Sequence, residues 1–417
     1  MDKIIITGGK KLKGEVTISG SKNATLPIQV ATLLTDAECT LLNVPQLRDI
    51  KTMNDVLKAI GMNVKGKKDN FVYQAKGALK NMAPYDLVKT MRASVLVVGP
   101  LLARLGEAKV ALPGGCAIGL RPINIHLDGF KKLGAKVEIR KGYVNLKAKK
   151  LVGNRITLDF PSVGATENLM MAAVLAEGKT VIDNAAREPE IVDLADFLNT
   201  LGAQISGAGT GMITIKGVKE LGSGTHAVIP DRIETGTFMV ASAITGGDIR
   251  IKNARLDHLT ALADKLRSTG VEIKEQDGDI LVDGSPKIKP VEVETMPYPG
   301  FPTDMQAQMM SLMCITPGTS IFTETIFENR FMHVGELQRM GADIVLKGNI
   351  AFVNGVKSLS GAQVMATDLR ASAALILAGL VAKGETEISR IYHLDRGYER
   401  IEVKLAKLGA KIKRIGE

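Results

Sequence analysis

Leu133-Gly134-Ala135-Lys136-Val137 is one of six versions of a short sequence that recurs along this chain of 417 residues. Each version places a glycine between a helix-forming segment and a short run containing β-branched residues. Such a glycine ends a helix, because it readily adopts the left-handed conformation that other residues avoid. The near-constant spacing of 73, 68, 68, 71 and 68 residues predicts six copies of one structural unit, ending their helices at Gly61, Gly134, Gly202, Gly270, Gly341 and Gly409.

An earlier segment of each unit is rich in alanine and other small apolar residues, as in Ala-Ser-Ala-Ala-Leu-Ile-Leu-Ala at 371–378. A helix that is apolar on nearly all sides is buried rather than amphipathic. We therefore predict an α/β protein made of two inside-out α/β barrel domains of three units each, with helices inside and sheets outside. The buried helices are expected to begin with polar residues whose free N–H groups favour anions, near Ser21, Arg92, Ala165, Glu234, Thr303 and Asp368.

The domain boundary is expected between the third and fourth units, where residues 221–232 are rich in glycine, serine and proline. This interpretation gives one domain at 21–229 and a second at 230–417. Residues 1–20 read as strands and are expected to complete the second domain. Two connections between the domains would suit a hinge that opens and closes around a ligand.

Composition favours a cytoplasmic enzyme without metal or cofactor. The chain is 45% hydrophobic and 24% charged, it contains no apolar run of the roughly 18 residues that a membrane span needs, and its start lacks a signal peptide. Three cysteines at no metal-like spacing predict neither a disulfide framework nor a zinc site. We expect no membrane insertion, and a monomer or weak homo-oligomer.

The net charge of +10 raises the question of nucleic acid, but aromatic residues make up only 4% of the chain and tryptophan is absent. Stacking platforms are therefore scarce, and the basic residues are scattered. We interpret the charge as steering small anions into a cleft and expect no nucleic-acid partner.

Pro-Gly-Gly-Cys-Ala-Ile-Gly-Leu-Arg-Pro at 113–122 is the strongest candidate for chemistry. Three glycines and two prolines predict a loop, which places the Cys116 thiol near the Arg121 guanidinium. A thiol in that setting is a nucleophile or acid candidate, and the alternative is a small hydrophobe in a surface loop. Arg121 also lies 13 residues before its repeat glycine, a position that gathers charge in several units: Arg48, Arg121, Pro189, Asp257, Glu328 and Arg396.

Together these features resemble the enolpyruvyl transferase family over the whole chain. The matching segments are 20–24, 91–94, 112–122, 162–166, 185–191, 301–308, 324–331, 368–372 and 395–400. The cysteine loop is typical of the amino-sugar branch rather than the shikimate branch. The resemblance implies transfer of the enolpyruvyl group of phosphoenolpyruvate to the 3-hydroxyl of UDP-N-acetylglucosamine with release of phosphate, the first committed step of peptidoglycan synthesis.

The resemblance also implies roles for individual residues. Cys116 would protonate C3 of phosphoenolpyruvate and would be alkylated by fosfomycin, and Asp304 would deprotonate or orient the sugar hydroxyl. Lys22, Arg121 and Arg396 would surround phosphoenolpyruvate, with Arg92 and Arg370 nearby and Asn23 on the intermediate. The nucleotide sugar would meet Arg121, Pro122, Ile123, Asn124, Ile125, Ser162, Val163, Gly164, Asp304 and Ile326.

One position departs from the family pattern: Phe160 and Pro161 stand where some members place a lysine near uridine. Arg330 and Glu328 are expected to be structural partners rather than catalytic groups. Two alternatives remain, a shikimate-3-phosphate acceptor and a non-catalytic nucleotide-sugar-binding paralogue. The second would require losses at Lys22, Cys116, Asp304 or Arg396, and all four are present.

Overall fold

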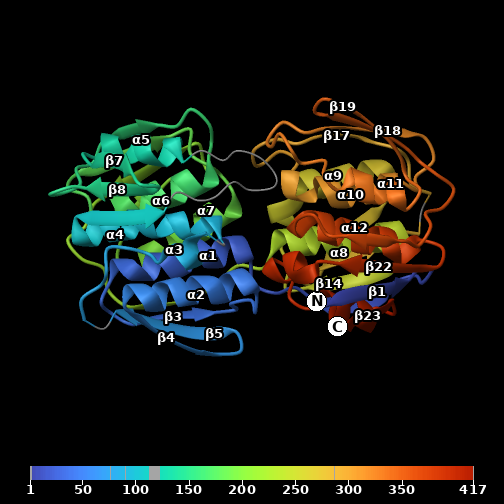
Figure 1. Ribbon diagram of the computed structural model, residues 1–417, viewed down its shortest axis with the longest axis horizontal. Coiled ribbons are helices and arrows are strands. Elements are labelled where there is room, and N and C mark those ends of the chain that lie inside the picture. The colour runs from blue at the N-terminus through green and yellow to red at the C-terminus, as the bar shows by residue number, and fades with distance from the viewer. Residues whose placement is uncertain (1, 76, 90, 112–122, 286, 417) are drawn as a thin grey trace. The chain divides into compact units, whose positions relative to one another are not determined.

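The computed structural model describes residues 2–75, 77–89, 91–111, 123–285 and 287–416 (Figure 1). Within these ranges the chain divides into two compact units. The amino-terminal unit contains residues 20–111 and 123–229, and the carboxy-terminal unit contains residues 2–19 and 230–416. Cys116, Arg121 and Pro122 lie outside the described residues.

The amino-terminal unit has inner helices that are buried and outer helices that are followed by the repeat glycines. The inner helices are α1 (Lys22–Ala31), α4 (Val98–Leu105) and α6 (Val163–Ala173). The outer helices are α2 (Arg48–Ile60), α5 (Asn124–Lys132) and α7 (Pro189–Thr200). Shorter turns of helix are η1 (Thr32–Leu34), α3 (Tyr85–Val88) and η2 (Arg92–Val97).

Three sheets surround these helices. The first has the order β13 (Gly224–Ala227), β3 (Cys39–Leu42), β5 (Asn70–Ala75), β4 (Met62–Lys67). The second has the order β6 (Glu107–Ala111), β8 (Tyr143–Lys147), β7 (Lys136–Arg140). The third has the order β11 (Gln204–Ser206), β12 (Met212–Lys216), β10 (Lys179–Asp183), β9 (Arg155–Thr157).

The carboxy-terminal unit repeats this plan. Its inner helices are α8 (Arg232–Thr245), α10 (Gln306–Met313) and α12 (Leu369–Val381), which pack on one another. Its outer helices are α9 (Thr260–Thr269), α11 (Val334–Arg339) and α13 (Ile401–Lys407). Its short helical turns are η3 (Leu256–Leu259), η4 (Thr303–Met305) and η5 (Ile391–Arg396).

Its three sheets are four-stranded. The first has the order β15 (Glu272–Gln276), β16 (Asp279–Asp283), β14 (Asp248–Lys252), β2 (Lys13–Thr17). The second has the order β17 (Glu292–Glu294), β18 (Thr319–Thr323), β20 (Ile350–Asn354), β19 (Asp343–Lys347). The third has the order β21 (Gln363–Met365), β22 (Glu385–Ser389), β1 (Lys3–Thr7), β23 (Lys411–Ile415). The amino-terminal strands thus belong to two of these sheets. Strand β1 pairs antiparallel with both β22 and β23, and β2 pairs parallel with β14.

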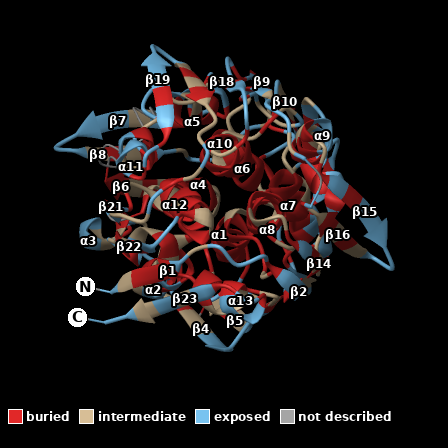
Figure 2. Cartoon of the chain, turned by 90° about the vertical axis from the view of Figure 1, so that its right-hand side faces the viewer, coloured by how far each residue is buried: buried red, intermediate tan, exposed pale blue. Residues whose placement is uncertain are grey.

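Burial follows the predicted arrangement of helices inside and sheets outside. Helices α6, α8, α10 and α12 are mostly red in Figure 2, whereas the tips of the β7–β8 and β15–β16 hairpins are pale blue. Each unit has its own hydrophobic core. The predicted six-unit α/β fold with buried inner helices is therefore confirmed.

The repeat glycines end the outer helices in the conformation that the sequence predicts. All six have positive φ, at 123°, 93°, 104°, 107°, 89° and 97° in chain order from Gly61 to Gly409. A residue with a Cβ is strained in this region, which explains why glycine recurs there.

Candidate functional site

The start of α1 holds a buried cation. Ser21 caps the helix by accepting a hydrogen bond from the backbone N–H of Ala24. The Lys22 side chain is only 10% exposed, and its Nζ lies 2.7 Å from Oδ2 of Asp49 in the first turn of α2. A buried ammonium needs such a partner because desolvation is costly. Asn23, the next residue, is half-buried.

His126, in the first turn of α5, is buried next to α6. The Asn168 side-chain amide donates to the backbone carbonyl of Val95 and also lies 3.2 Å from Nδ1 of His126. Nδ1 therefore accepts, which assigns the ring proton to Nε2 in the neutral ring. Burial, and then the charge of Arg92, lower the pKa of His126 to about 4. His126 was not among the residues predicted from the sequence, although it directly follows the 123–125 run predicted to meet the sugar nucleotide.

The other predicted nucleotide-sugar residues of this unit lie at two helix starts. Ser162 caps α6 by accepting from the N–H of Ala165 at 3.4 Å, and Val163 and Gly164 form its half-buried first turn. At the start of α5, Ile123 is buried, Asn124 is exposed and Ile125 is half-buried. Phe160, at the position of the family lysine, is 42% exposed.

Asp304 forms the charged centre of the carboxy-terminal unit. Nη2 of Arg330 donates to its Oδ1 at 2.7 Å, and Nη2 of Arg370 donates to its Oδ2 at 2.8 Å. Both arginine side chains are at most 5% exposed, whereas that of Asp304 is 28% exposed. The two guanidinium groups thus fix the carboxylate, which remains partly exposed. Arg330, expected to be a structural partner, directly contacts the predicted catalytic carboxylate.

Burial opposes the charge of Arg370, but the carboxylates of Asp304 and Asp231 outweigh it and raise the pKa of the guanidinium. Arg370 also lies over the Tyr398 ring, with its Cζ 5.6 Å from the ring centroid. The Tyr398 hydroxyl lies 2.9 Å from Oγ1 of Thr237 and accepts from Nε2 of Gln308 at 3.2 Å. The same Gln308 amide donates to the backbone carbonyl of Asp304 at 2.9 Å.

The half-buried Arg396 ends η5, two residues before Tyr398. Its neighbour Asp395 accepts from Nη2 of Arg414 in β23 at 2.5 Å. Asp395 directly precedes Arg396, and Asp49 directly follows Arg48, another residue of the predicted charge-bearing position. Both carboxylates form ion pairs, Asp49 with Lys22 and Asp395 with Arg414.

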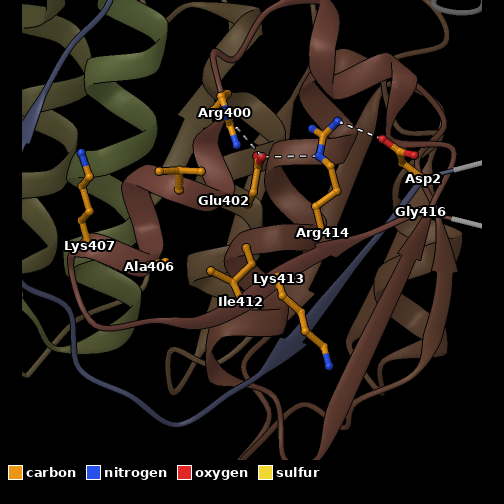
Figure 3. A pocket seen from close by; sticks show the side chains of 10 residues that line it. Asp2, Arg400, Glu402, Ala406, Lys407, Ile412, Lys413, Arg414 and Gly416 are labelled. Carbon is orange, nitrogen blue, oxygen red and sulfur yellow. Dashed lines mark hydrogen bonds and ion pairs between the residues drawn. The ribbon is translucent and has the colours of Figure 1, made fainter.

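A hollow of about 670 Å³ lies beside the chain ends and contains none of the predicted site residues (Figure 3). Arg414 lies within ion-pair distance of Asp2 and Glu402 there, and Arg400 also lies close to Glu402. Because its principal cation is engaged by carboxylates, we assign this hollow no role in the chemistry.

Two of the three cysteines are inert. Cys39 and Cys314 are fully buried, and burial raises the pKa of each thiol to about 12. A thiol in that state is neither a nucleophile nor an acid near neutral pH. No group of three or more metal-binding side chains occurs in the described part of the chain, and no helix there is long and apolar enough to cross a bilayer.

The described charged features are thus a buried lysine at the start of α1 in the amino-terminal unit and, in the carboxy-terminal unit, a carboxylate held by two buried arginines. Both lie on a six-unit α/β fold. The model of the family EPSP synthase (3-phosphoshikimate 1-carboxyvinyltransferase) matches residues 6–405. The chain belongs to this family of enolpyruvyl transferases.

Within the family, the chain is similar over its whole length to enzymes named for an amino-sugar substrate. It is 61% identical over 417 residues, 100% of both chains, to the UDP-N-acetylglucosamine 1-carboxyvinyltransferase of Geotalea daltonii, and 61% identical over the same coverage to that of Geobacter metallireducens. Among solved structures, the enolpyruvyl transferase NikO from Streptomyces tendae matches with a TM-score of 0.89 and 25% identity, covering 99% of this chain and 98% of that one. The EPSP synthase from Acinetobacter baumannii has the same fold, with a TM-score of 0.78 and 18% identity over 100% of both chains.

Proposed function

We propose that this chain transfers the enolpyruvyl group of phosphoenolpyruvate to the 3-hydroxyl of UDP-N-acetylglucosamine, releasing phosphate, in peptidoglycan synthesis. The observation that carries the proposal is 61% identity over the complete length of both chains to enzymes with that name. The shikimate-pathway alternative has weaker support, because the Acinetobacter baumannii EPSP synthase shares only 18% identity.

The reaction is an addition followed by an elimination. In the addition, C3 of phosphoenolpyruvate receives a proton while the sugar oxygen bonds to C2 and loses its own proton, giving a tetrahedral ketal. In the elimination, C3 loses a proton and the C2–O bond to phosphate breaks, so that the double bond forms again. The chain must therefore supply an acid, a group for the hydroxyl proton, and cations for phosphate and carboxylate.

We assign the acid to Cys116, which lies outside the described residues. Support comes from the other two thiols, since burial removes Cys39 and Cys314 from consideration. Lys22, Arg121 and Arg396, with Arg92 and Arg370 nearby, are the proposed cations for phosphoenolpyruvate, and Asn23 is the proposed donor to the intermediate. Ionised donors of this kind make short, strong hydrogen bonds to phosphate and carboxylate oxygens.

We assign to Asp304 the role of orienting the sugar hydroxyl and accepting its proton. Both of its oxygens accept from guanidinium groups, and the side chain remains 28% exposed. Because two cations balance its charge, the carboxylate is a poor base for an isolated alcohol. It therefore orients the hydroxyl and takes its proton as the C–O bond forms. The remaining sugar-nucleotide contacts are proposed at Ile326 and at the starts of α5 and α6.

We further propose that the protein acts in the cytoplasm on these two water-soluble substrates and works as a monomer or weak homo-oligomer. No cofactor or metal is required by the addition–elimination chemistry. Nucleic acid is not among the proposed partners.

The decisive experiment measures phosphate release from phosphoenolpyruvate with UDP-N-acetylglucosamine or shikimate 3-phosphate as acceptor. We expect release with the amino sugar alone. Cys116→Ala is expected to lose about 10²–10⁴-fold in turnover, the usual value of a positioned general acid, whereas Cys116→Asp retains activity because it supplies another acid. Fosfomycin is expected to add its mass to the peptide containing Cys116.

The other outcomes separate the alternatives. Release with shikimate 3-phosphate alone would make the chain a shikimate-branch enzyme. Binding of the nucleotide sugar without release from either acceptor would make it a non-catalytic binder. Full activity of Cys116→Ala would remove the thiol from the chemistry while leaving the substrate assignment intact.

A further inference from the structure

A buried carboxylate that the proposed mechanism does not use lies beside Asp304. Glu324 directly follows β18 and is only 3% exposed. Its Oε1 accepts from Oγ1 of Thr295 at 2.8 Å, from the N–H of Ile326 at 2.8 Å and from the N–H of Phe327 at 3.2 Å. Its Oε2 accepts from Oγ1 of Thr303 at 2.9 Å.

These four donors come from three separate segments. Thr295 directly follows β17, Thr303 begins η4, and Ile326 and Phe327 form the turn after β18. No lysine, arginine or histidine in the described ranges forms an ion pair with Glu324, so hydrogen bonds alone compensate its burial. Three of the four donors converge on Oε1 and one on Oε2, so both carboxylate oxygens accept hydrogen bonds.

Burying a carboxylate without a cation is expensive unless its hydrogen bonds are good. An apolar side chain could not accept hydrogen bonds from these three chain segments and hold them together. Thr295 strengthens the junction, because its hydroxyl also accepts from the N–H of Thr325 at 2.9 Å. Thr295 is itself fully buried.

Two of the bonded residues lie at the proposed sugar side of the site. Thr303 directly precedes Asp304, the proposed partner of the acceptor hydroxyl, and Ile326 is a proposed contact of the nucleotide sugar. We propose that Glu324 is a positioning residue for the acceptor substrate, which sets the distance between Asp304 and the turn at Ile326. This inference rests on the proposed function, since it concerns the same two residues.

The inference predicts a selective kinetic effect. Glu324→Ala releases the turn and the start of η4 together. We expect the KM for UDP-N-acetylglucosamine to rise about tenfold or more and kcat to fall about tenfold, because a displacement of about 1 Å at a reacting group costs as much as 10²-fold. The KM for phosphoenolpyruvate, whose proposed cations do not bond to Glu324, is expected to change less than about threefold.

Glu324→Gln tests whether the hydrogen bonds of this side chain are sufficient for substrate positioning when an amide replaces the carboxylate. The amide oxygen takes the place of Oε1 with its three donors, and the amide nitrogen donates to Oγ1 of Thr303, which accepts after rotation of its hydroxyl. We therefore expect Glu324→Gln to restore both KM values to within about threefold of the unmodified enzyme.

Thr303→Val removes the single bond to Oε2 and leaves the three bonds to Oε1. We expect it to lower kcat, through Asp304, more than it raises the KM for the nucleotide sugar. Thr319→Val is the matched control, because Thr319 is an exposed residue at the far end of the same β18 strand, where its hydroxyl donates to Asn354. Its kinetics are expected to be unchanged.

Thermal unfolding is measured for every variant, and a purely structural role would lower Tm without changing either KM. Unchanged KM values in Glu324→Ala, or equal rises for both substrates, would overturn the inference. If Glu324→Ala does not fold, the test of the inference is the comparison of Thr303→Val with Glu324→Gln. In that case an unchanged kcat in Thr303→Val would overturn the inference. If the unmodified protein releases no phosphate with the amino sugar, the proposed function fails instead.

Discussion

The chemistry of the Asp304 carboxylate depends strongly on the groups that contact it. The guanidinium groups of Arg330 and Arg370 hold one oxygen each, and both arginines are almost fully buried. The carboxylate therefore has a fixed orientation and a balanced charge. Its backbone is fixed as well, by the side-chain amide of Gln308.

Asp304→Asn keeps the size of the side chain but removes its charge. We expect kcat to fall about 10²–10⁴-fold, as for other general acid–base groups, because the amide cannot accept the hydroxyl proton. The substitution also removes the carboxylate charge that both buried guanidinium groups contact. The cost is expected to be less than the roughly 3–5 kcal/mol typical of fully buried pairs, because Asp304 is partly exposed. Steady-state kinetics and urea unfolding measure the two effects separately.

Leu312→Val, a conservative change in the neighbouring core of α10, provides a stability control. If it matches Asp304→Asn in unfolding free energy but keeps full kcat, the catalytic loss belongs to the carboxylate. An Asp304→Asn enzyme with unchanged kcat would contradict the role assigned to Asp304.

His126 predicts a pH dependence of stability. Its pKa falls from the ordinary 6.5 to about 4 in the folded chain, first because of burial and then because of Arg92. Between these values the unfolded chain binds more protons, so acidification favours unfolding. We expect the free energy of unfolding to fall from about pH 6.5 towards pH 4, by at most about 1.4 kcal/mol per pH unit for this group.

Urea unfolding of His126→Gln across this range measures the contribution. The slope is expected to decrease but not to vanish, because burial lowers the pKa of His333 to about 4 as well. Glu167 acts in the opposite direction, since burial raises its pKa and its contribution is lost as pH rises. An identical slope in His126→Gln would contradict the prediction.

At the scale of elements, polar side chains join the inner helices of the carboxy-terminal unit. Thr237 of α8 and Gln308 of α10 meet at the Tyr398 hydroxyl, beside Arg370 of α12. The hydroxyl therefore connects three inner helices with the segment that carries Arg396. Burial is the main cause that raises the pKa of Tyr398, so the hydroxyl stays protonated.

Tyr398→Phe removes this hydroxyl and leaves the ring. We expect the free energy of unfolding to fall by about 1–2 kcal/mol, the cost of a buried hydrogen bond, with little change in the denaturant m-value. Thr237 and Gln308 keep their bonds to Ile233 and Asp304, which limits the loss. Tyr85→Phe, at an exposed tyrosine, is the matched control, and equal stabilities of the two variants would contradict the expectation.

The repeat pattern predicted these elements with one systematic difference. The second and fifth inner helices begin as 3₁₀ turns, η2 and η4, before they continue as α4 and α10. For α4 a physical reason is visible: Pro100 lacks a backbone N–H and is tolerated in the first helical turn, and α4 begins at Val98. For η4 the structure offers no comparable explanation.

At the scale of the whole molecule, residues 2–19 belong to the carboxy-terminal unit. Strand β1 lies between β22 and β23, and Ile4 and Ile6 of β1 are fully buried. The carboxy-terminal unit therefore cannot complete its sheets until residues separated by almost the whole chain have met. The cost of closing so long a loop grows only slowly with its length.

Deleting residues 2–19 is expected to abolish cooperative unfolding of the carboxy-terminal unit, because two of its sheets lose a strand. The control is a circular permutant that starts at residue 230, joins the old ends with a short linker and finishes at residue 229. Lys3 and Ile415 are paired neighbours across β1 and β23, so the join requires little distance. We expect the permutant to unfold cooperatively and release phosphate, and a deletion variant that unfolds like the intact protein would contradict this interpretation.

The sequence alone determined the six-unit plan, the buried inner helices and the family, because these depend on periodic glycines, composition and local motifs. Only the tertiary structure decided which charged groups meet. Arg330 and Arg370 lie 26 and 66 residues from Asp304, and Glu324 accepts a hydrogen bond from Thr295, 29 residues away. Such pairings depend on how helices and strands pack at atomic distances, which neither spacing nor composition specifies.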